Sequence, residues 1–159
     1  MIPVIGFVGY SNSGKTTIVS RLVSTLKQRG YQVAAIKHAS HGYDMDAPGK
    51  DSRQHFDAGA DQVIVVGPDS FSHHHRGHAD LMDVIKRISD VDIILVEGFK
   101  GEPIPKIEII SQDKPDQRIP LREDLQAVIS FRKESENVPC FDPNDLDGLA
   151  DFLVKRFLL

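Results

Sequence analysis

The chain has 159 residues, of which 40% are hydrophobic and 26% charged, and its formal net charge is −4. This length predicts one soluble domain, residues 1–159, and the mild negative charge disfavours a general nucleic-acid binder, which normally has a basic face. The single cysteine, Cys140, excludes an intramolecular disulfide. The sequence has neither a secretory signal nor the roughly 18 consecutive apolar residues of a membrane span. We therefore expect a cytoplasmic protein with no membrane or nucleic-acid partner.

The first predicted elements are a strand, a glycine-rich loop and a helix. Ile2 to Val8 is an unbroken apolar run, typical of a strand covered on both faces of a parallel sheet. The next eight residues, Gly9 to Thr16, have the G-x-x-x-x-G-K-T pattern of a phosphate-binding P-loop. From about Lys15 to Arg29 apolar residues recur at helical spacing, and Gly30 follows as a C-cap. This order predicts binding of a nucleoside triphosphate.

The fixed positions of the loop each have a chemical role. Gly9 and Gly14 let the backbone turn tightly, so that successive N–H groups point at phosphate oxygens above the helix N-terminus. Lys15 supplies a mobile charge for the β- and γ-phosphates, and the Thr16 hydroxyl is the expected Mg²⁺ ligand.

Strands and helices then alternate. Val33 to Ile36 is predicted as a short buried strand, Asp51 to Ala58 as a short helix capped by its aspartate, and Gln62 to Val66 as a third buried strand. Between the first two lies a polar loop, Ala39 to Lys50, expected at the ligand-binding edge of the sheet.

Three polar residues of this part are candidates for the site. Lys37, at the end of its strand, is in a position to approach phosphate. Asp46 and Asp51 are the catalytic candidates, since either could approach the metal or a water, and ordinary solvation in a loop remains the alternative for each.

A histidine-rich segment, Ser72 to His78, contains His73, His74, His75 and His78. Adjacent side chains in an irregular loop rarely converge on one ion, so a solvated loop is favoured over a metal site.

The second informative stretch ends at Glu97. After a predicted helix over Asp80 to Ile88, Asp92 starts a fourth strand whose apolar residues run from Ile93 to Val96. A P-loop needs an acidic partner at the end of another buried strand, so Glu97 is predicted to serve Mg²⁺ together with Thr16.

The remaining pattern changes character. Glu102 to Ile110 contains two prolines and alternates charged and apolar residues, which predicts an edge strand with one wet face. Further strands are predicted at Leu125 to Ile129 and Val138 to Phe141, and Asn144 or Asp145 caps a last amphipathic helix. The fold class is therefore α/β: a three-layer, mostly parallel sheet of the P-loop NTPase type.

Base selectivity is not fixed by a motif. The sequence lacks Asn-Lys-x-Asp, the guanine-reading element of many GTPases. Ser130 to Lys133 follows a predicted strand and is in a plausible position for a base contact.

Several stretches together extend the P-loop pattern to a family. The chain resembles the molybdopterin-guanine dinucleotide biosynthesis protein B family in these segments: Gly9 to Thr17, Lys37-His38, Asp44 to Ser52, Ala58-Gly59-Ala60 and Val96-Glu97-Gly98-Phe99-Lys100. The resemblance covers nearly the whole chain.

The resemblance implies a weakly hydrolysing GTP-binding homodimer that assists the molybdenum cofactor guanylyltransferase, the enzyme that attaches GMP to molybdopterin. GTP and Mg²⁺ would be its ligands, with molybdopterin or its guanine dinucleotide as a further ligand. The dimer would form through a β-ribbon at about 101–125, which suits the edge strand expected there. By position, the nucleotide-binding residues would be Gly9, Ser11, Asn12, Ser13, Gly14, Lys15, Thr16, Thr17 and Lys37, with Thr16 and Glu97 serving the metal.

Two other function classes stay open. A small-molecule kinase would share the P-loop but usually carries an arginine-rich lid, for which Arg118 and Arg122 are the nearby pair. A metal-insertion GTPase would use the histidine segment to store metal.

Overall fold

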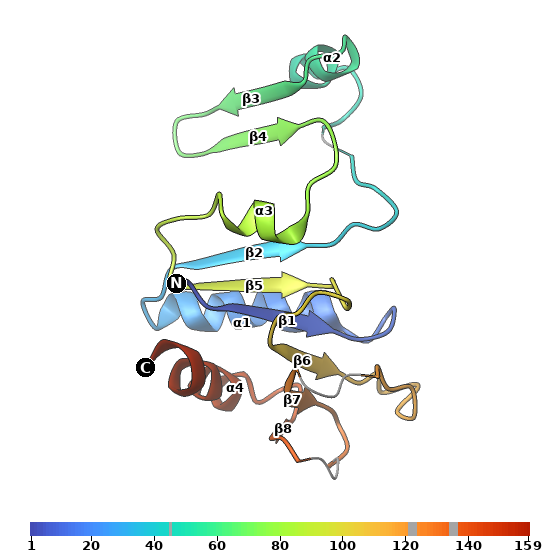
Figure 1. The fold of residues 1–159 in the computed structure, drawn as a ribbon, viewed down its shortest axis with the longest axis vertical. Coiled ribbons are helices and arrows are strands. Elements are labelled where there is room, and N and C mark those ends of the chain that lie inside the picture. Colours follow the sequence, from blue (N-terminus) through green and yellow to red (C-terminus); the bar gives the residue numbers. More distant parts are fainter. Residues whose placement is uncertain (45, 121–123, 134–136) are drawn as a thin grey trace. The chain divides into compact units, whose positions relative to one another are not determined.

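The computed structural model describes residues 1–44, 46–120, 124–133 and 137–159. The chain divides into two compact units, which are drawn in Figure 1. Unit 1 comprises Met1–His38 and Ile85–Leu159, and unit 2 comprises Ala39–Val84. The predicted P-loop therefore belongs to unit 1.

Unit 1 is built on a parallel sheet. Within the described residues, six strands pair in the order β2-β5-β1-β6-β7-β8, and every neighbouring pair is parallel. Their bounds are β1 Val4–Val8, β2 Val33–Lys37, β5 Ile93–Glu97, β6 Lys106–Ile109, β7 Leu125–Ile129 and β8 Cys140–Phe141. Because the strands are parallel, their carboxyl ends all meet at one edge of the sheet.

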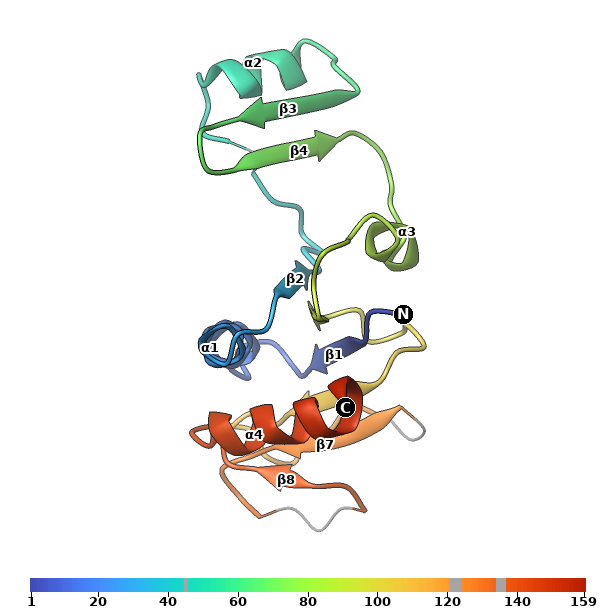
Figure 2. The ribbon, with the colours of Figure 1, turned by 90° about the vertical axis from the view of Figure 1, so that its left-hand side faces the viewer.

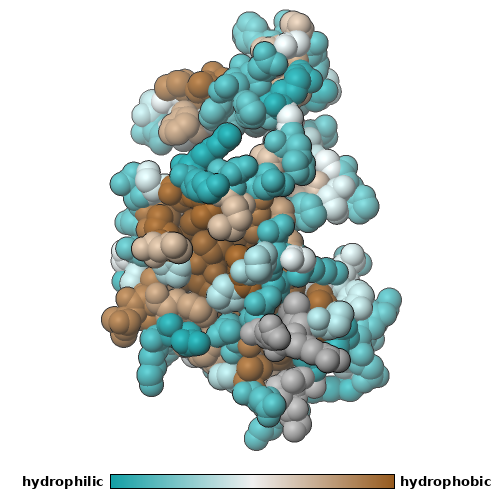
Figure 3. Space-filling view, in the orientation of Figure 1, coloured by the Kyte–Doolittle hydropathy of each residue, from teal (hydrophilic) through white to brown (hydrophobic). Residues whose placement is uncertain are grey.

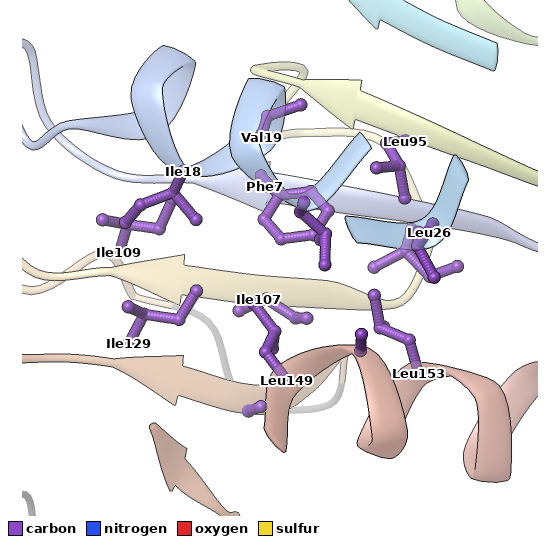
Figure 4. Packing of buried hydrophobic residues seen from close by; sticks show 14 of the residues in the cluster. Phe7, Ile18, Val19, Leu26, Leu95, Ile107, Ile109, Ile129, Leu149 and Leu153 are labelled. Atoms are coloured by element: carbon purple, nitrogen blue, oxygen red, sulfur yellow. The ribbon is translucent and has the colours of Figure 1, made fainter. Parts of the chain in front are cut away.

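Two helices share one core with a face of this sheet. Helix α1 spans Lys15–Gln28, and α4 spans Leu146–Leu153 and continues as the π-helix η1, Val154–Leu158. Figure 4 shows side chains of both helices directed at alternate residues of the strands, such as Phe7 and Ile107. The helical periodicity of the sequence thus becomes a buried stripe, whose burial drives the packing. No helix in the described ranges is long and apolar enough to cross a membrane.

Strand β6 differs from its prediction. The alternation in the sequence predicts an edge strand with one wet face, but β6 lies between β1 and β7 and all four of its residues are buried. Lys106 and Glu108 are each 1% exposed. Charged groups tolerate such burial only when they are paired and hydrogen-bonded.

Both buried charges have partners from outside the strand. Lys106 Nζ donates to the carbonyl oxygens of Glu102 and Ile104 and lies 3.1 Å from Asp124 Oδ2. On the other residue, Glu108 Oε2 accepts from Nε and Nη2 of Arg118 at 2.9 and 2.8 Å.

The other carboxylate oxygen of Glu108, Oε1, accepts a third hydrogen bond, from the backbone N–H of Ile119 at 2.6 Å. The connection between β6 and β7 thus supplies Arg118 and Asp124, which neutralise the two charges that the sequence alone predicts to face water.

Unit 2 contains helix α2, Asp51–Asp57, and the antiparallel strands β3, Gln62–Val66, and β4, Phe71–His75. Helix α3, Leu81–Ile85, crosses the boundary into unit 1. Figures 1 and 2 both place α2 on the β3 side of the strand pair. The prediction of a strand at Gln62–Val66 is confirmed, but its predicted burial is wrong, since Val63 alone among these five residues is buried. Its partner β4 also replaces the predicted histidine loop by a strand.

These observations confirm the predicted fold class, an α/β protein with a mostly parallel sheet and an added β-ribbon. The location of the ribbon differs from the prediction. The family resemblance implies a ribbon at about 101–125, but β6 of that segment is an internal parallel strand, and the antiparallel pair among the described residues is β3–β4.

The buried carboxylate of Glu108 yields a stability prediction. We expect Glu108→Ala to lower the free energy of unfolding by about 3 kcal/mol, because it removes the buried acceptor of the Ile119 N–H and a carboxylate partner of the Arg118 guanidinium. The matched control is Asp57→Ala, which removes an exposed arginine pair with Arg53 at 2.9 Å and should cost less than about 1 kcal/mol. Urea unfolding of the two variants measures the difference, and equal losses would contradict the structural role of Glu108.

Candidate functional site

The P-loop lies where the connections of the sheet diverge. The connection that follows β1 leads to β2 on the β5 side of β1, whereas the connection that follows β5 leads to β6 on the opposite side of β1. Ligands of open α/β sheets bind outside the carboxyl ends of strands at such a point. The register places Phe7 opposite Glu97, and Glu97 opposite Lys37. Three strand ends therefore bring a loop, a carboxylate and a lysine together.

The backbone of the P-loop turns tightly, as the sequence predicts. Asn12 and Gly14 have φ values of 62° and 87°, in the left-handed region, which curves the backbone sharply. Gly9 is required for a different reason. A Cβ on Gly9 would lie 2.5 Å from the carbonyl oxygen of Ile109 and from Ser13 Oγ, so only glycine fits beside β6.

Helix α1 presents its N-terminus to this loop. Gly14 is the N-cap residue and has no side chain to accept from the first helical N–H groups, and the first turn carries no acidic residue. These N–H groups and the positive end of the helix dipole therefore favour an anion such as a phosphate.

Thr16, Glu97 and Lys37 form one hydrogen-bonded cluster. Thr16 Oγ1 donates to Glu97 Oε1 at 2.6 Å and accepts from Lys37 Nζ at 3.3 Å, while Lys37 Nζ lies 3.6 Å from Glu97 Oε1. The Glu97 side chain is 12% exposed, whereas that of Lys37 is 61% exposed. A threonine hydroxyl that donates to a carboxylate and accepts one hydrogen bond, from Lys37, keeps a lone pair for a cation, and hard oxygen donors suit Mg²⁺. These side chains fit the predicted metal.

Lys15 folds over the loop from the first turn of α1. Its Nζ donates to the carbonyl oxygens of Gly9 and Tyr10 at 3.1 and 2.7 Å. Burial lowers the pKa of Lys15, the negative charge of Glu97 raises it, and the nearby Lys100 and Lys37 lower it further. A negative ligand at this position would relieve the repulsion among these ammonium groups.

The end of β5 is locked against the end of β2. His38 donates its backbone N–H to the carbonyl of Glu97 at 2.9 Å, and its ring stacks on Phe99 with centroids 4.4 Å apart. A Cβ on Gly98 would lie 2.8 Å from His38 Cβ, and Gly98 has a φ of 98°. The Lys-His and Glu-Gly-Phe stretches of the sequence are therefore packed against each other and fix the position of Glu97.

Comparison with known proteins agrees with this geometry. Residues 4–131 match the model of the family described as molybdopterin guanine dinucleotide synthesis protein B, MobB. The chain belongs to this family.

Relatives within the family cover nearly the full chain. The molybdopterin-guanine dinucleotide biosynthesis adapter protein of Escherichia coli is 37% identical over 98% of this chain and 93% of its own length, and that of Haemophilus influenzae is 34% identical over 96% and 88%. The crystal structure of Bacillus subtilis MobB superposes with a TM-score of 0.75 at 30% identity, covering 95% of this chain and 98% of that one.

The structure brings most of the predicted site residues of this family member to one place. Those of the loop and first helical turn are Gly9, Ser11, Asn12, Ser13, Gly14, Lys15, Thr16 and Thr17, and Lys37 and Glu97 join them from β2 and β5. The two catalytic candidates lie in unit 2, where Asp46 accepts a hydrogen bond from Ser52 and Asp51 begins α2. Their catalytic role stays a prediction.

The structure bears on the two alternative functions, a small-molecule kinase and a metal-insertion GTPase. Arg118, one half of the predicted kinase lid, donates two hydrogen bonds to the buried Glu108, and Arg122 lies outside the described residues. In the described part of the chain, no group of three or more histidine, cysteine, aspartate or glutamate side chains is arranged to hold a metal ion. His73 instead pairs with Gln62 at 2.8 Å.

Sequence reasoning missed two features of the site. One is the stacking of His38 on Phe99, and the other is the approach of Lys100 to the P-loop through Tyr10. All four residues lie in or next to the stretches that carry the family resemblance, which is the one signal that could have singled them out.

The lowered pKa of Lys15 predicts a pH-dependent stability. The unfolded chain binds this proton more tightly, so the folded state gains stability relative to the unfolded one as pH rises through the folded pKa towards 10.5. We therefore expect the parent protein to gain stability relative to Lys15→Met as the pH rises from neutral towards about 10.5. Unfolding of both proteins at matched pH measures this, with Lys114→Met as control. A constant difference across this range would contradict the burial of the Lys15 charge.

Proposed function

We propose that this chain is a GTP-binding adapter in the conversion of molybdopterin to molybdopterin guanine dinucleotide. It would act in the cytoplasm with the molybdenum cofactor guanylyltransferase that attaches GMP to molybdopterin. The observation that carries the proposal is the cluster of Thr16, Glu97 and Lys37 at the P-loop of a chain whose full-length relatives are named adapters of this synthesis.

The ligands of the proposed site are GTP and Mg²⁺. When bound, Mg²⁺ supplies positive charge that neutralises the β- and γ-phosphate oxygens. Thr16 and Glu97 offer the oxygen donors, the loop amides and Lys15 hold phosphate oxygens, and Lys37 exchanges its contact with Thr16 for phosphate. Molybdopterin or its guanine dinucleotide is proposed as a further ligand.

Guanine contact is assigned to the end of β7. Ser130–Lys133 follows β7 at the same edge of the sheet as the P-loop, and the Phe131 side chain is 51% exposed. An exposed aromatic ring is a suitable surface for stacking a purine.

Hydrolysis is proposed to be slow, below roughly 1 s⁻¹. Rapid phosphoryl transfer to water needs a group that orients the attacking water. The carboxylate at the loop is unsuited to that task, because Glu97 is held by the Thr16 hydroxyl and lies beside the Lys37 ammonium. An adapter with this site responds to nucleotide binding more than to turnover.

The proposed function predicts selective nucleotide binding. Calorimetric titration in Mg²⁺ should show tighter binding of GTP than of ATP, and Lys15→Ala should weaken GTP binding by about ten- to a hundredfold, because it removes a charged donor to phosphate. Glu97→Gln should weaken the Mg²⁺ dependence more than nucleotide affinity itself. Lys114→Ala, at an exposed loop position, serves as control. Binding of ATP alone, with phosphorylation of a pterin or nucleoside, would favour a kinase.

A homodimer through the β3–β4 ribbon is part of the proposal. Ile64, Val66 and Phe71 are 58%, 78% and 74% exposed, and Figure 3 shows the corresponding apolar atoms at the β3–β4 end of unit 2. A two-stranded ribbon is marginally stable alone, and large apolar side chains at its surface favour association. The family resemblance favours a second copy as the occupant.

The dimer proposal predicts the effect of charges on this ribbon. Val66→Asp combined with Phe71→Asp should shift the molecular mass in solution from dimer to monomer, because carboxylates would be buried without partners. Phe131→Asp introduces a single such charge at an exposed aromatic position of unit 1 and should leave the mass unchanged. Sedimentation measures both, and a dimer that survives the double substitution would exclude the ribbon as the interface.

A further inference from the structure

The chain makes an unusually sharp turn immediately after Glu97. Gly98 and Phe99 have φ values of 98° and 53°, two successive residues in the left-handed region. The N–H of Glu102 then donates to the carbonyl of Phe99 at 3.1 Å, so that Lys100 is the second residue of a tight turn. A left-handed conformation costs a phenylalanine about 1–2 kcal/mol, and stacking on His38 offsets part of this cost. The turn has a defined, strained geometry.

This turn brings Lys100 to the P-loop. Its Nζ lies 5.0 Å from the centroid of the Tyr10 ring, and Tyr10 is the first variable residue of the loop. The carbonyl oxygen of Tyr10 accepts from Lys15 Nζ at 2.7 Å. Lys15 and Lys100 therefore reach the same loop residue, one at its backbone and the other at its ring.

The charges around the loop agree with this placement. Lys100 is a positive neighbour that lowers the pKa of Lys15, as does Lys37. Lys15, Lys37 and Lys100 thus share the surroundings of the loop with the carboxylate of Glu97, whose Oε1 lies 3.6 Å from Lys37 Nζ. Such a concentration of positive charge is unfavourable unless a polyanion shares the site.

We propose that Lys100 binds the terminal phosphate of the nucleoside triphosphate and makes the site prefer triphosphate over diphosphate. The inference rests on the proposed triphosphate function of the P-loop and extends it to a residue outside the motif. Tyr10 holds the ammonium beside the loop, from which it transfers to the phosphate. Lys100 acts as a binding and specificity-determining residue.

A surface lysine resting on a tyrosine ring is the simpler interpretation. An exposed cation–π contact contributes about 0.5–1 kcal/mol, whereas a hydrogen bond between charged groups contributes about 1.5–3 kcal/mol. The phosphate contact is therefore the stronger of the two, and the ring does not retain the ammonium when a triphosphate is present. The two interpretations differ in what removal of the charge does to triphosphate affinity.

The test compares triphosphate and diphosphate binding in matched variants. The full chain is titrated calorimetrically with GDP and with a non-hydrolysable GTP analogue in Mg²⁺, using the parent, Lys100→Gln, Lys100→Arg and the control Lys114→Gln. Loss of one charged phosphate contact should raise the Kd of Lys100→Gln for the analogue about tenfold and that for GDP less than about twofold. Lys100→Arg should retain most of the affinity, and Lys114→Gln should match the parent. Unchanged thermal unfolding of each variant excludes a folding defect.

Each outcome decides between the interpretations. No loss for Lys100→Gln, or equal losses for analogue and GDP, would overturn the proposal. If the parent binds adenine nucleotides in place of guanine nucleotides, the proposed base selectivity fails, and the same triphosphate-to-diphosphate ratio measured with ADP and an ATP analogue still judges Lys100. If the parent binds neither nucleotide at millimolar concentration, the P-loop function and the role of Lys100 fail together.

Discussion

The hydrogen bond from Thr16 to Glu97 depends on the register of three parallel strands. Phe7 pairs with Glu97 and Glu97 pairs with Lys37, so residues distant in the sequence meet at one point. Shifting β5 by one residue would turn its side chains to the opposite face and remove the carboxylate from the loop. The four apolar residues of β5, Ile93 to Val96, are all fully buried, so a slip in either direction would carry the charged Asp92 or Glu97 into this buried run. Core packing thereby fixes the geometry of the polar site.

Strand β6, the second neighbour of β1, restricts the space available to the P-loop. The carbonyl of Ile109 leaves no room for a Cβ on Gly9, and β6 is itself held in the sheet by its buried charges. Arg118 connects the two, because it pairs with Glu108 and its carbonyl oxygen accepts from the Tyr10 hydroxyl at 3.4 Å. A buried ion pair is weak evidence for added stability but is well suited to specifying one arrangement. Here it specifies where β6 stands beneath the P-loop.

The local pattern of apolar and polar residues predicts an element correctly where contacts with the rest of the chain do not change which of its side chains are buried. The bounds of α1 and β7 follow from periodicity and apolar runs. Strand β3 was predicted with its observed bounds, but its burial was mispredicted because five residues rich in valine and isoleucine are equally compatible with a buried strand and with an exposed ribbon. Strand β6 was mispredicted because alternation assumes that charged side chains face water, whereas Lys106 and Glu108 find partners that the sequence does not reveal.

The residues of the site likewise include some that the sequence predicts and some that it does not. Lys15 and Thr16 are fixed by covalent spacing within the motif, but the position of Lys100 depends on the left-handed backbone of Phe99, which no spacing rule predicts. Net charge is similarly uninformative. The chain carries −4 overall, yet three ammonium groups and one carboxylate give the P-loop surroundings a formal balance of +2. Because salt screens charges beyond about 10 Å, a polyanion at the loop responds to this local cluster and not to the acidic remainder of the surface. The strained turn after Glu97 is therefore best understood as the device that adds the third ammonium group to that cluster.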